Sequence, residues 1–254
     1  MTRIRVHADA ARASAAVARE LAAALARKRA LVLALPTGRT PIPLYEALGD
    51  LCRRGDADFT RARTFNLDEL IGVAPSHPSS YRAFMDRHLF SKIDIPRRRT
   101  QVLNGLARDS RRECARFERA IGRAGGIDIL ILGLGRNGHI GFNEPGAALA
   151  ASTHRVPLTP ATRRANAVWF GGQLRRVPRE ALTMGIGTIL RARRIVLLAF
   201  GRPKAAVVRR MLEGPVTPRL PASFLQLHPD VEIVLDRAAA SRLSRGGATR
   251  RPSA

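Results

Sequence analysis

Residues 133–146 combine five glycines with two asparagines, a histidine and a glutamate, directly after the apolar run Ile129–Leu132. Such a run is typical of a strand buried on both faces, and open α/β sheets bind their ligands in the loops at the carboxyl ends of such strands. His139 can change protonation near neutral pH, and Glu144 can orient or polarise its ring. An isolated histidine is more often simply packed in the fold, but Asn137 and the other polar groups around this one favour acid/base chemistry.

The same loop also matches a dinucleotide-binding spacing, in the pattern Gly133-x-Gly135-x-x-Gly138. In that fingerprint the third glycine opens a helix, whereas here Gly141 and Pro145 follow, and both disfavour a helix start. No second strand ending in an acid follows at the required distance. We therefore expect no nicotinamide or flavin cofactor.

A second candidate group is the carboxylate of Asp68, at the end of the predicted strand 63–67. Adjacent acids such as Asp68 and Glu69 are usually solvated loop residues. Asp68, however, directly follows an apolar–polar alternation and would lie at the mouth of the sheet. A partly desolvated carboxylate in that position can serve as a base toward an acidic C–H.

Two further stretches suggest an anion site. Thr37, Gly38, Arg39 and Thr40 form a turn ahead of a predicted helix, where backbone N–H groups and hydroxyls favour phosphate, although a plain turn with Thr40 as helix cap is equally consistent. Lys204 lies in the first turn of another predicted helix, where a cation is disfavoured by roughly 0.3–1 kcal/mol. A lysine placed against that preference suggests a nearby anion, and together these groups predict a site for proton transfer on a phosphorylated small molecule.

The elements that must position these groups alternate between strand and helix. We expect strands at 4–6, 30–35, 63–67, 101–103, 128–132, 194–200 and 231–235, an extended segment at 153–157, helices at 9–29, 41–53, 79–90, 109–122, 161–170 and 204–214, and a helical turn at 223–227. This order predicts a single-domain α/β fold with three α/β/α layers and a mainly parallel, Rossmann-like central sheet. We expect the domain to span 1–240 and the basic tail 241–254 to be disordered.

The composition limits the binding partners and the cellular compartment that the sequence predicts. The net charge is +24, but only three of the 44 basic residues are lysines and the remaining 41 arginines spread along the chain, while aromatic residues are only 5%. We therefore expect no specific nucleic-acid binding. With no long apolar run, no secretory signal, and only Cys52 and Cys114 as thiols, we expect a cytoplasmic protein without membrane contact or a bound metal.

Taken together, several stretches resemble the glucosamine-6-phosphate deaminase family. The resemblance runs from about residue 30 to 236 and rests on six motifs in order: LPTGRTP (Leu35–Pro41), FNLDE (Phe65–Glu69), SHPSSY (Ser76–Tyr81), GHIGFNEP (Gly138–Pro145), ALTMGIGT (Ala181–Thr188) and LQLHP (Leu225–Pro229). It implies conversion of glucosamine 6-phosphate and water to fructose 6-phosphate and ammonia, with no cofactor. Whether the chain forms a homo-oligomer is left open.

The resemblance also implies roles for individual residues. His139, with Glu144 as its partner, would assist opening of the sugar ring, and Asp68 would move a proton between C2 and C1. The phosphate would be held by the turn Thr37–Thr40 and by Lys204.

Two positions depart from the family pattern. Asn137 stands where many members have aspartate, and it is expected to accept a hydrogen bond from the His139 ring without supplying charge. Val168 stands where an arginine is expected to help hold the phosphate, so Arg163 or Arg164 one turn back is a candidate replacement.

Two alternatives come from neighbouring protein classes. A 6-phosphogluconolactonase-type hydrolase would share the phosphate turn and the Gly-His loop, but would not be expected to have the stretch Phe142–Pro145 or the motif Leu225–Pro229. A sugar-phosphate-binding domain without turnover would also fit the lack of an arginine at position 168. Such domains usually follow a DNA-binding module, of which this sequence shows no sign.

Overall fold

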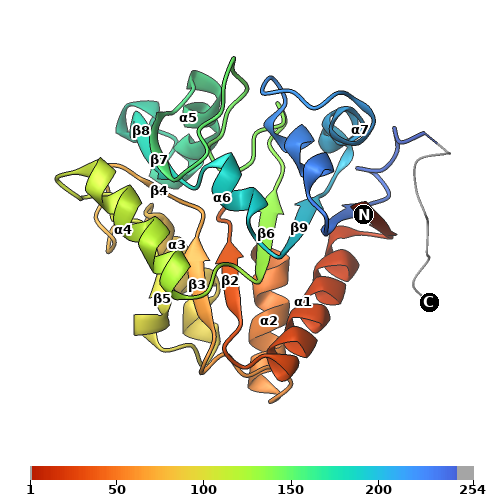
Figure 1. Cartoon of the computed structure of the whole chain (residues 1–254), viewed down its shortest axis with the longest axis horizontal. Coiled ribbons are helices and arrows are strands. Elements are labelled where there is room, and N and C mark those ends of the chain that lie inside the picture. The colour runs from red at the N-terminus through yellow and green to blue at the C-terminus, as the bar shows by residue number, and fades with distance from the viewer. Residues whose placement is uncertain (1, 245–254) are drawn as a thin grey trace.

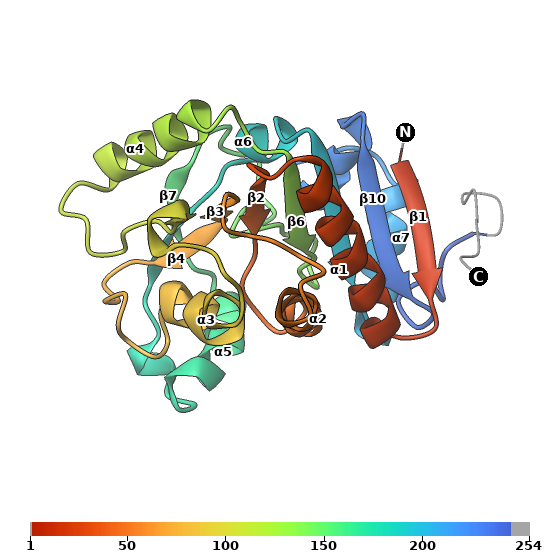
Figure 2. The ribbon, with the colours of Figure 1, turned by 90° about the horizontal axis from the view of Figure 1, so that it is seen from below.

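The central strands present two apolar faces, and this alternation organises the fold. In β6 (Ile129–Gly133), Ile129 and Ile131 join one buried cluster while Leu130 and Leu132 join another. Successive side chains of a strand point to opposite faces, so both faces of such a sheet must be covered. The computed structural model describes residues 2–244 and has helices on both sides of this sheet (Figures 1 and 2).

The central sheet has seven strands, and all are parallel. Their spatial order is β1 (Thr2–His7), β10 (Val231–Asp236), β9 (Arg194–Ala199), β6, β2 (Val32–Leu35), β3 (Arg63–Asn66) and β5 (Thr100–Gln101). From β2 the chain builds the sheet outward through β3 and β5, and from β6 it builds in the other direction through β9 and β10. The direction therefore reverses between β2 and β6, and doubly wound sheets bind ligands at such a switch point.

Two groups of helices complete the three layers. One face packs against α1 (Ala10–Arg27), α2 (Ile42–Arg53) and α3 (Tyr81–His88), and the other against α4 (Ser110–Arg123), α6 (Ile186–Leu190) and α7 (Ala205–Glu213). Short 3-10 turns connect these elements: η1 (Phe90–Lys92), η2 (Arg97–Arg99), η4 (Leu174–Arg176), η5 (Arg202–Lys204) and η6 (Pro221–Leu227). The predicted three-layer α/β/α fold with a mainly parallel sheet is confirmed.

Local capping explains where several helices begin. The Asp9 carboxylate accepts a hydrogen bond from the Arg12 N–H at the start of α1, and Asp109 accepts from the Arg111 and Arg112 N–H groups at the start of α4. The prediction that Thr40 caps the second helix is wrong. Pro41 occupies the N-cap position of α2 and no side chain caps that helix, since the chain already turns into helical geometry at the proline.

A second, antiparallel sheet was not predicted. It consists of β4 (Asp68–Leu70), β8 (Glu180–Thr183) and β7 (His154–Pro157), and α5 (Pro160–Asn166) with the turn η3 (Ala167–Phe170) packs beside it. Asp68 and Glu69 therefore lie in a strand and not in a loop, which corrects the sequence-based assignment. Adjacent acids are unusual in strands, and only pairing with β8 reveals this one.

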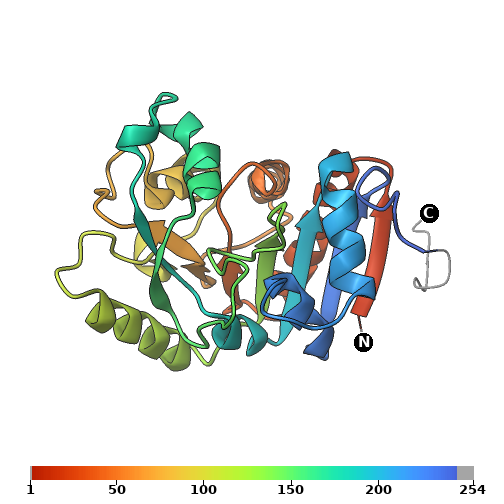
Figure 3. The ribbon, with the colours of Figure 1, turned by 90° about the horizontal axis from the view of Figure 1, so that it is seen from above.

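Four neighbouring strands, β9, β6, β2 and β3, deliver the candidate residues to one edge of the central sheet. Lys204 follows β9, the glycine-rich loop follows β6, the Thr37–Thr40 turn follows β2, and Asp68 follows β3. Figure 3 views the molecule from this edge.

The ends of the chain add little to this picture. The predicted disordered tail falls mostly on residues 245–254, which lie outside the described residues, while Ser244 donates hydrogen bonds to Glu213. Among the described residues, no helix has the length and apolar character needed to cross a membrane.

Candidate active site

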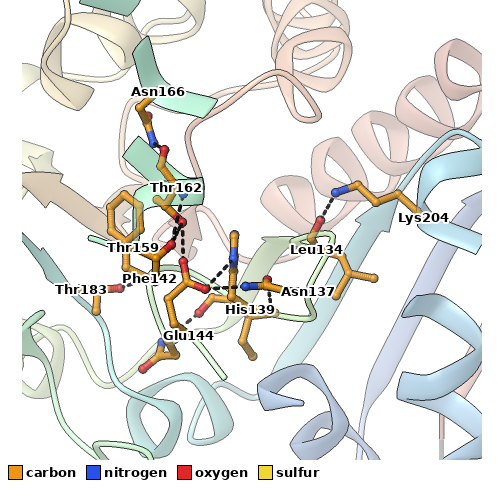
Figure 4. A network of polar contacts seen from close by, with 12 residues as sticks. Leu134, Asn137, His139, Phe142, Glu144, Thr159, Thr162, Asn166, Thr183 and Lys204 are labelled. Carbon is orange, nitrogen blue, oxygen red and sulfur yellow. Dashed lines mark hydrogen bonds and ion pairs between the residues drawn. The ribbon is translucent and has the colours of Figure 1, made fainter. Parts of the chain in front are cut away.

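Glu144 is the centre of a hydrogen-bonded network in the loop after β6 (Figure 4). Its Oε2 accepts a hydrogen bond of 2.6 Å from the Asn137 Nδ2 and lies 3.4 Å from the His139 Nδ1. Its Oε1 accepts a hydrogen bond from the Thr162 hydroxyl. Burial would raise the pKa of Glu144, but these polar neighbours, His139 foremost, lower it to about 2, so the group is a carboxylate at neutral pH. The predicted pairing of His139 with Glu144 is present.

Asn137 contacts the histidine differently from the prediction. Its Oδ1 accepts from the backbone N–H of His139 at 3.2 Å, and its Nδ2 donates to Glu144. Because the amide uses its oxygen for one contact and its nitrogen for the other, both contacts fix its orientation. The expected bond from the His139 ring to Asn137 is therefore wrong, and Asn137 acts on the ring through Glu144.

Two glycines shape the loop around His139. A Cβ atom on Gly135 would stand 2.5 Å from the Cγ of His139, so the imidazole packs directly against the Gly135 backbone. Gly138 has a φ of +92°, which disfavours a side chain. The predicted absence of a helix after Gly138 is confirmed, because the backbone instead forms a bridge between Ile140 and Asn143.

Asp68 is buried at the start of β4, beside the same loop. It pairs in register with Thr183 of β8, whose hydroxyl accepts the Phe142 N–H, and a Cβ on Gly141 would stand 3.9 Å from the Asp68 Oδ2. Burial, and secondarily the charge of Glu69, raises the pKa of Asp68 to about 8. The structure thus brings a carboxyl group that titrates near neutral pH close to the His139–Glu144 loop.

Glu69 has a role that the sequence did not suggest. Its carboxylate, in a residue only 2% exposed, accepts hydrogen bonds from the backbone N–H groups of Leu70, Tyr81 and Arg82. Burial raises its pKa to about 7 despite these bonds. Glu69 therefore ties the N-terminus of α3 to the strand that carries Asp68.

The predicted anion-binding residues lie on either side of the switch point between β2 and β6. Gly38 has a φ of +98°, and the turn is supported by a hydrogen bond from the Tyr45 hydroxyl to the Pro36 carbonyl. Lys204 donates to the Leu134 carbonyl in the glycine-rich loop, and burial lowers its pKa. Arg39 is exposed at this edge.

Part of the Thr37–Thr40 turn also lines a cavity next to α5. Thr37 and Gly38 share it with residues of α3, of the loop before α3 and of the segment 160–170, namely Pro78, Ser79, Ser80, Tyr81, Phe84, Arg87, Asn166 and Trp169.

Position 168 carries an exposed valine, where an arginine was expected to help hold the phosphate. The structure narrows the choice of the residue that could supply this cation instead. The guanidinium of Arg163 donates to the carbonyls of Leu174 and Val177, so it is already engaged within its own segment. Arg164 is exposed one turn before Val168. Of the two candidates, only Arg164 remains.

Thr162 is the polar contact of Glu144 that sequence reasoning missed. It lies 18 residues after Glu144 in the chain, in α5, and nothing in its immediate sequence marks it. No cluster of three or more histidine, cysteine, aspartate or glutamate side chains suited to a metal ion occurs within residues 2–244.

Fold and site together define a doubly wound α/β domain with acid/base groups at the carboxyl ends of its central strands. The family model described as glucosamine-6-phosphate isomerases/6-phosphogluconolactonase matches residues 6–234, and the chain belongs to this family.

Known relatives narrow the comparison. The chain is 50% identical over 233 residues to the glucosamine-6-phosphate deaminase of Rhodopirellula baltica, covering 92% of each chain. It is 47% identical over 210 residues to the enzyme of the same name from Thermoanaerobacter pseudethanolicus, covering 83% of each chain. A solved monomeric glucosamine-6-phosphate deaminase superposes with a TM-score of 0.91 at 42% identity, over 94% of this chain and 99% of that one.

More distant structures share the fold alone. The 6-phosphogluconolactonase of Thermotoga maritima has a TM-score of 0.73 at 19% identity, over 93% of this chain and 99% of that one.

The packing of His139 on Gly135 gives a first prediction. Gly135→Ala places a methyl group inside the imidazole ring's contact distance, and we expect a loss of about 1–3 kcal/mol in the free energy of unfolding with a displaced His139 ring. Gly133→Ala is the matched control, because a Cβ there meets nothing within 4 Å. Urea unfolding and a crystal structure of each variant measure the difference. Equal stabilities with an unmoved ring would contradict the contact.

Burial of Asp68 gives a second prediction. The unfolded aspartate loses its proton near pH 4, whereas the folded group keeps its proton up to about pH 8. Between these values the folded state binds more protons, so this group makes the protein less stable as pH rises. Asp68→Asn cannot ionise, so its stability gain over the wild type should grow by roughly 4 kcal/mol from pH 5 to pH 9.

Thermal unfolding across this pH range measures the gain. The exposed Asp56 provides the control, since Asp56→Asn should show no gain that grows with pH. A gain for Asp68→Asn that is absent, or that shrinks toward pH 9, would show that the folded Asp68 ionises like an exposed group.

Proposed function

We propose that the chain catalyses the isomerising deamination of glucosamine 6-phosphate, producing fructose 6-phosphate and ammonia. The observation that carries the proposal is the placement of Asp68 beside the His139–Glu144 loop at one sheet edge. This reaction needs a group that moves a proton next to a carbonyl or iminium carbon, and a second group that protonates and deprotonates the ring oxygen. Relatives 44–50% identical to the chain, all named glucosamine-6-phosphate deaminase, support the same reaction.

His139 is the group proposed to open the sugar ring. Its ring is partly accessible, with 28% of the side chain exposed, and Glu144 lies behind it with 11% exposed. A partly exposed imidazole can pass a proton to and from the ring oxygen of the sugar, and the neighbouring Glu144 carboxylate orients it. Contacts with His139, and then with Thr162 and Asn137, lower the pKa of Glu144 and keep it ionised for this purpose.

Asp68 is proposed to transfer the proton between C2 and C1. In the free protein its raised pKa keeps it largely protonated at neutral pH. An amino sugar carries an ammonium group at C2, and a cation beside a buried carboxyl favours the carboxylate. Substrate binding would thus convert Asp68 into the base that the reaction needs. A general base of this kind typically accelerates a reaction roughly 10²–10⁴-fold.

The phosphate is proposed to bind between the Thr37–Thr40 turn and Lys204. Backbone N–H groups of the turn and the ammonium of Lys204 are suitable donors for a phosphate oxygen. Lys204 now donates to the Leu134 carbonyl, a bond that it can exchange for the stronger charge-assisted one. Of Arg163 and Arg164, the second is the candidate for the cation that Val168 does not supply, because Arg163 already donates to two backbone carbonyls.

A reducing cytoplasm is the compartment that we propose for this chemistry. Both thiols are free, and burial raises the pKa of each, that of Cys114 to about 11. Such thiols are unreactive as nucleophiles and typical of proteins that form no disulfides.

A direct assay tests the reaction. Purified protein with millimolar glucosamine 6-phosphate should release ammonia and fructose 6-phosphate in equal amounts, and unphosphorylated glucosamine should react far more slowly because it lacks the bound anion. Other amino-sugar phosphates and 6-phosphogluconolactone complete the panel. Absence of ammonia, or hydrolysis of the lactone instead, would refute the proposal.

Isotope exchange tests the role of Asp68. In D₂O the wild-type protein should incorporate deuterium at C1 of fructose 6-phosphate, because the proton passes through a group that exchanges with solvent. Asp68→Asn should lower both deuterium incorporation and kcat by at least about 10²-fold, since the amide cannot accept the proton. Circular dichroism confirms folding of the variant. Exchange at the wild-type rate would remove Asp68 from this role.

A further inference from the structure

The hydroxyl of Thr162 is the contact between helix α5 and Glu144. Thr162 is 7% exposed, and its Oγ1 donates to the Glu144 Oε1. The same oxygen accepts a hydrogen bond of 3.0 Å from the Thr159 hydroxyl, and Thr159 in turn accepts from the Thr162 N–H at 3.1 Å as the helix N-cap. These neighbours therefore direct the hydrogen bond of the Thr162 hydroxyl to the carboxylate, and Figure 4 shows the two groups in contact.

The other end of α5 is attached to the segment that follows Asp68. The Asn166 Nδ2 donates to the Thr162 carbonyl at 3.0 Å, and the Asn166 Oδ1 accepts from the Tyr81 hydroxyl at 3.2 Å. The N–H of Tyr81 donates to Glu69, the residue next to Asp68. Helix α5 thus connects the loop of His139 and Glu144 to the strand of Asp68 through hydrogen bonds at both of its ends.

The two oxygens of Glu144 have different partners. Oε1 is held by Thr162, while Oε2 accepts from Asn137 and faces the His139 ring. A carboxylate turns about its last side-chain bond unless both oxygens are fixed, and turning would move Oε2 away from the ring. The Asn137 bond fixes one oxygen, and Thr162 fixes the other.

We propose that Thr162 is a positioning residue for the reaction: its hydroxyl fixes the Glu144 carboxylate toward His139 and makes that orientation depend on the docking of α5. The proposal rests on the deaminase function given above. Thr162 does not touch the substrate in this scheme, and it acts only through Glu144.

Thr162→Val tests the proposal, because valine keeps the shape of threonine and removes the hydroxyl. Hydrogen bonds to charged groups are among the stronger ones in proteins, so we expect kcat for glucosamine 6-phosphate to fall about 10-fold. KM should stay within about twofold, since the phosphate contacts are untouched. Thr162→Ser retains the hydroxyl and should keep at least about half of the wild-type kcat.

A matched control removes the same kind of bond elsewhere. Thr188 is 2% exposed and donates to Glu118 of α4 at 2.6 Å, so this is also a pair of a buried threonine and a partly buried glutamate. Thr188→Val should lower stability to a similar extent while leaving kcat within about twofold of wild type. If Thr188→Val lowers kcat as much as Thr162→Val does, the effect is general destabilisation and the proposal fails.

The Glu144→Gln background separates positioning from other effects. If Thr162 acts through the carboxylate, Thr162→Val should lower kcat no further in that background. An equal fall in both backgrounds would overturn the proposal.

Unfolding measurements need no substrate, so they test the contact between Thr162 and Glu144 independently of the proposed deaminase function. In urea unfolding, Thr162→Val and Glu144→Gln should be non-additive, with a coupling of at least about fivefold in the unfolding equilibrium constant. Additive effects would show that the bond between them contributes nothing. If coupling is found but the wild-type protein makes no ammonia, the proposed function fails while the contact stands.

Discussion

Leu67 lies between the two sheets and its backbone bonds to both, and the active-site geometry depends on this junction. Its N–H donates to the Leu35 carbonyl of β2 at 3.2 Å, and its carbonyl accepts from the Met184 N–H, just after β8, at 2.7 Å. The chain therefore leaves the parallel sheet and enters the antiparallel one within a single residue. Asp68, the next residue, is only 7% exposed because one sheet lies before it and the other beside it. A loop at this point would have left the carboxyl group hydrated and strongly acidic.

The junction also explains why the site combines a stable scaffold with a destabilising group. Glu69 is buried next to Asp68 but is compensated by three backbone N–H donors from β4 and α3. Asp68 has no comparable set of partners, and its Oδ1 is among the buried polar atoms without a hydrogen bond in the described residues. A buried polar group without a partner costs about 1–3 kcal/mol, which the apolar layers on both sides of the central sheet can offset. Functional groups are expected at the places where a fold tolerates such a cost.

The central sheet could be predicted from the sequence because its strands are apolar runs. Capping acids and glycines mark the helices and loops that lie between these strands. Ile129–Leu132 and Asp109 are examples in which local chemistry and final structure agree. The candidate residues were also placed at one edge correctly, since parallel strands end together. The small sheet could not be predicted in this way, because β4 is three residues long, contains two acids, and exists only through pairing with β8 more than 100 residues later. Thr162 likewise contacts Glu144 only after the chain has folded back.

Asn137 shows how a neutral side chain, at a position where the resemblance leads one to expect aspartate, can be accommodated by the direction of one hydrogen bond. An ionised aspartate at this position could not donate to Glu144, and two carboxylates at the observed 2.6 Å would repel each other until one of them took up a proton. The asparagine amide instead donates, so Glu144 remains the one negative charge of the cluster formed by Asn137, His139, Glu144 and Thr162. The network consequently needs a second donor on the opposite oxygen to hold that carboxylate, and α5 provides it with Thr162. With the neutral Asn137, Glu144 is the one negatively charged group of this cluster. Hydrogen bonds from Asn137 and Thr162 hold it in place where a second acid would have contributed.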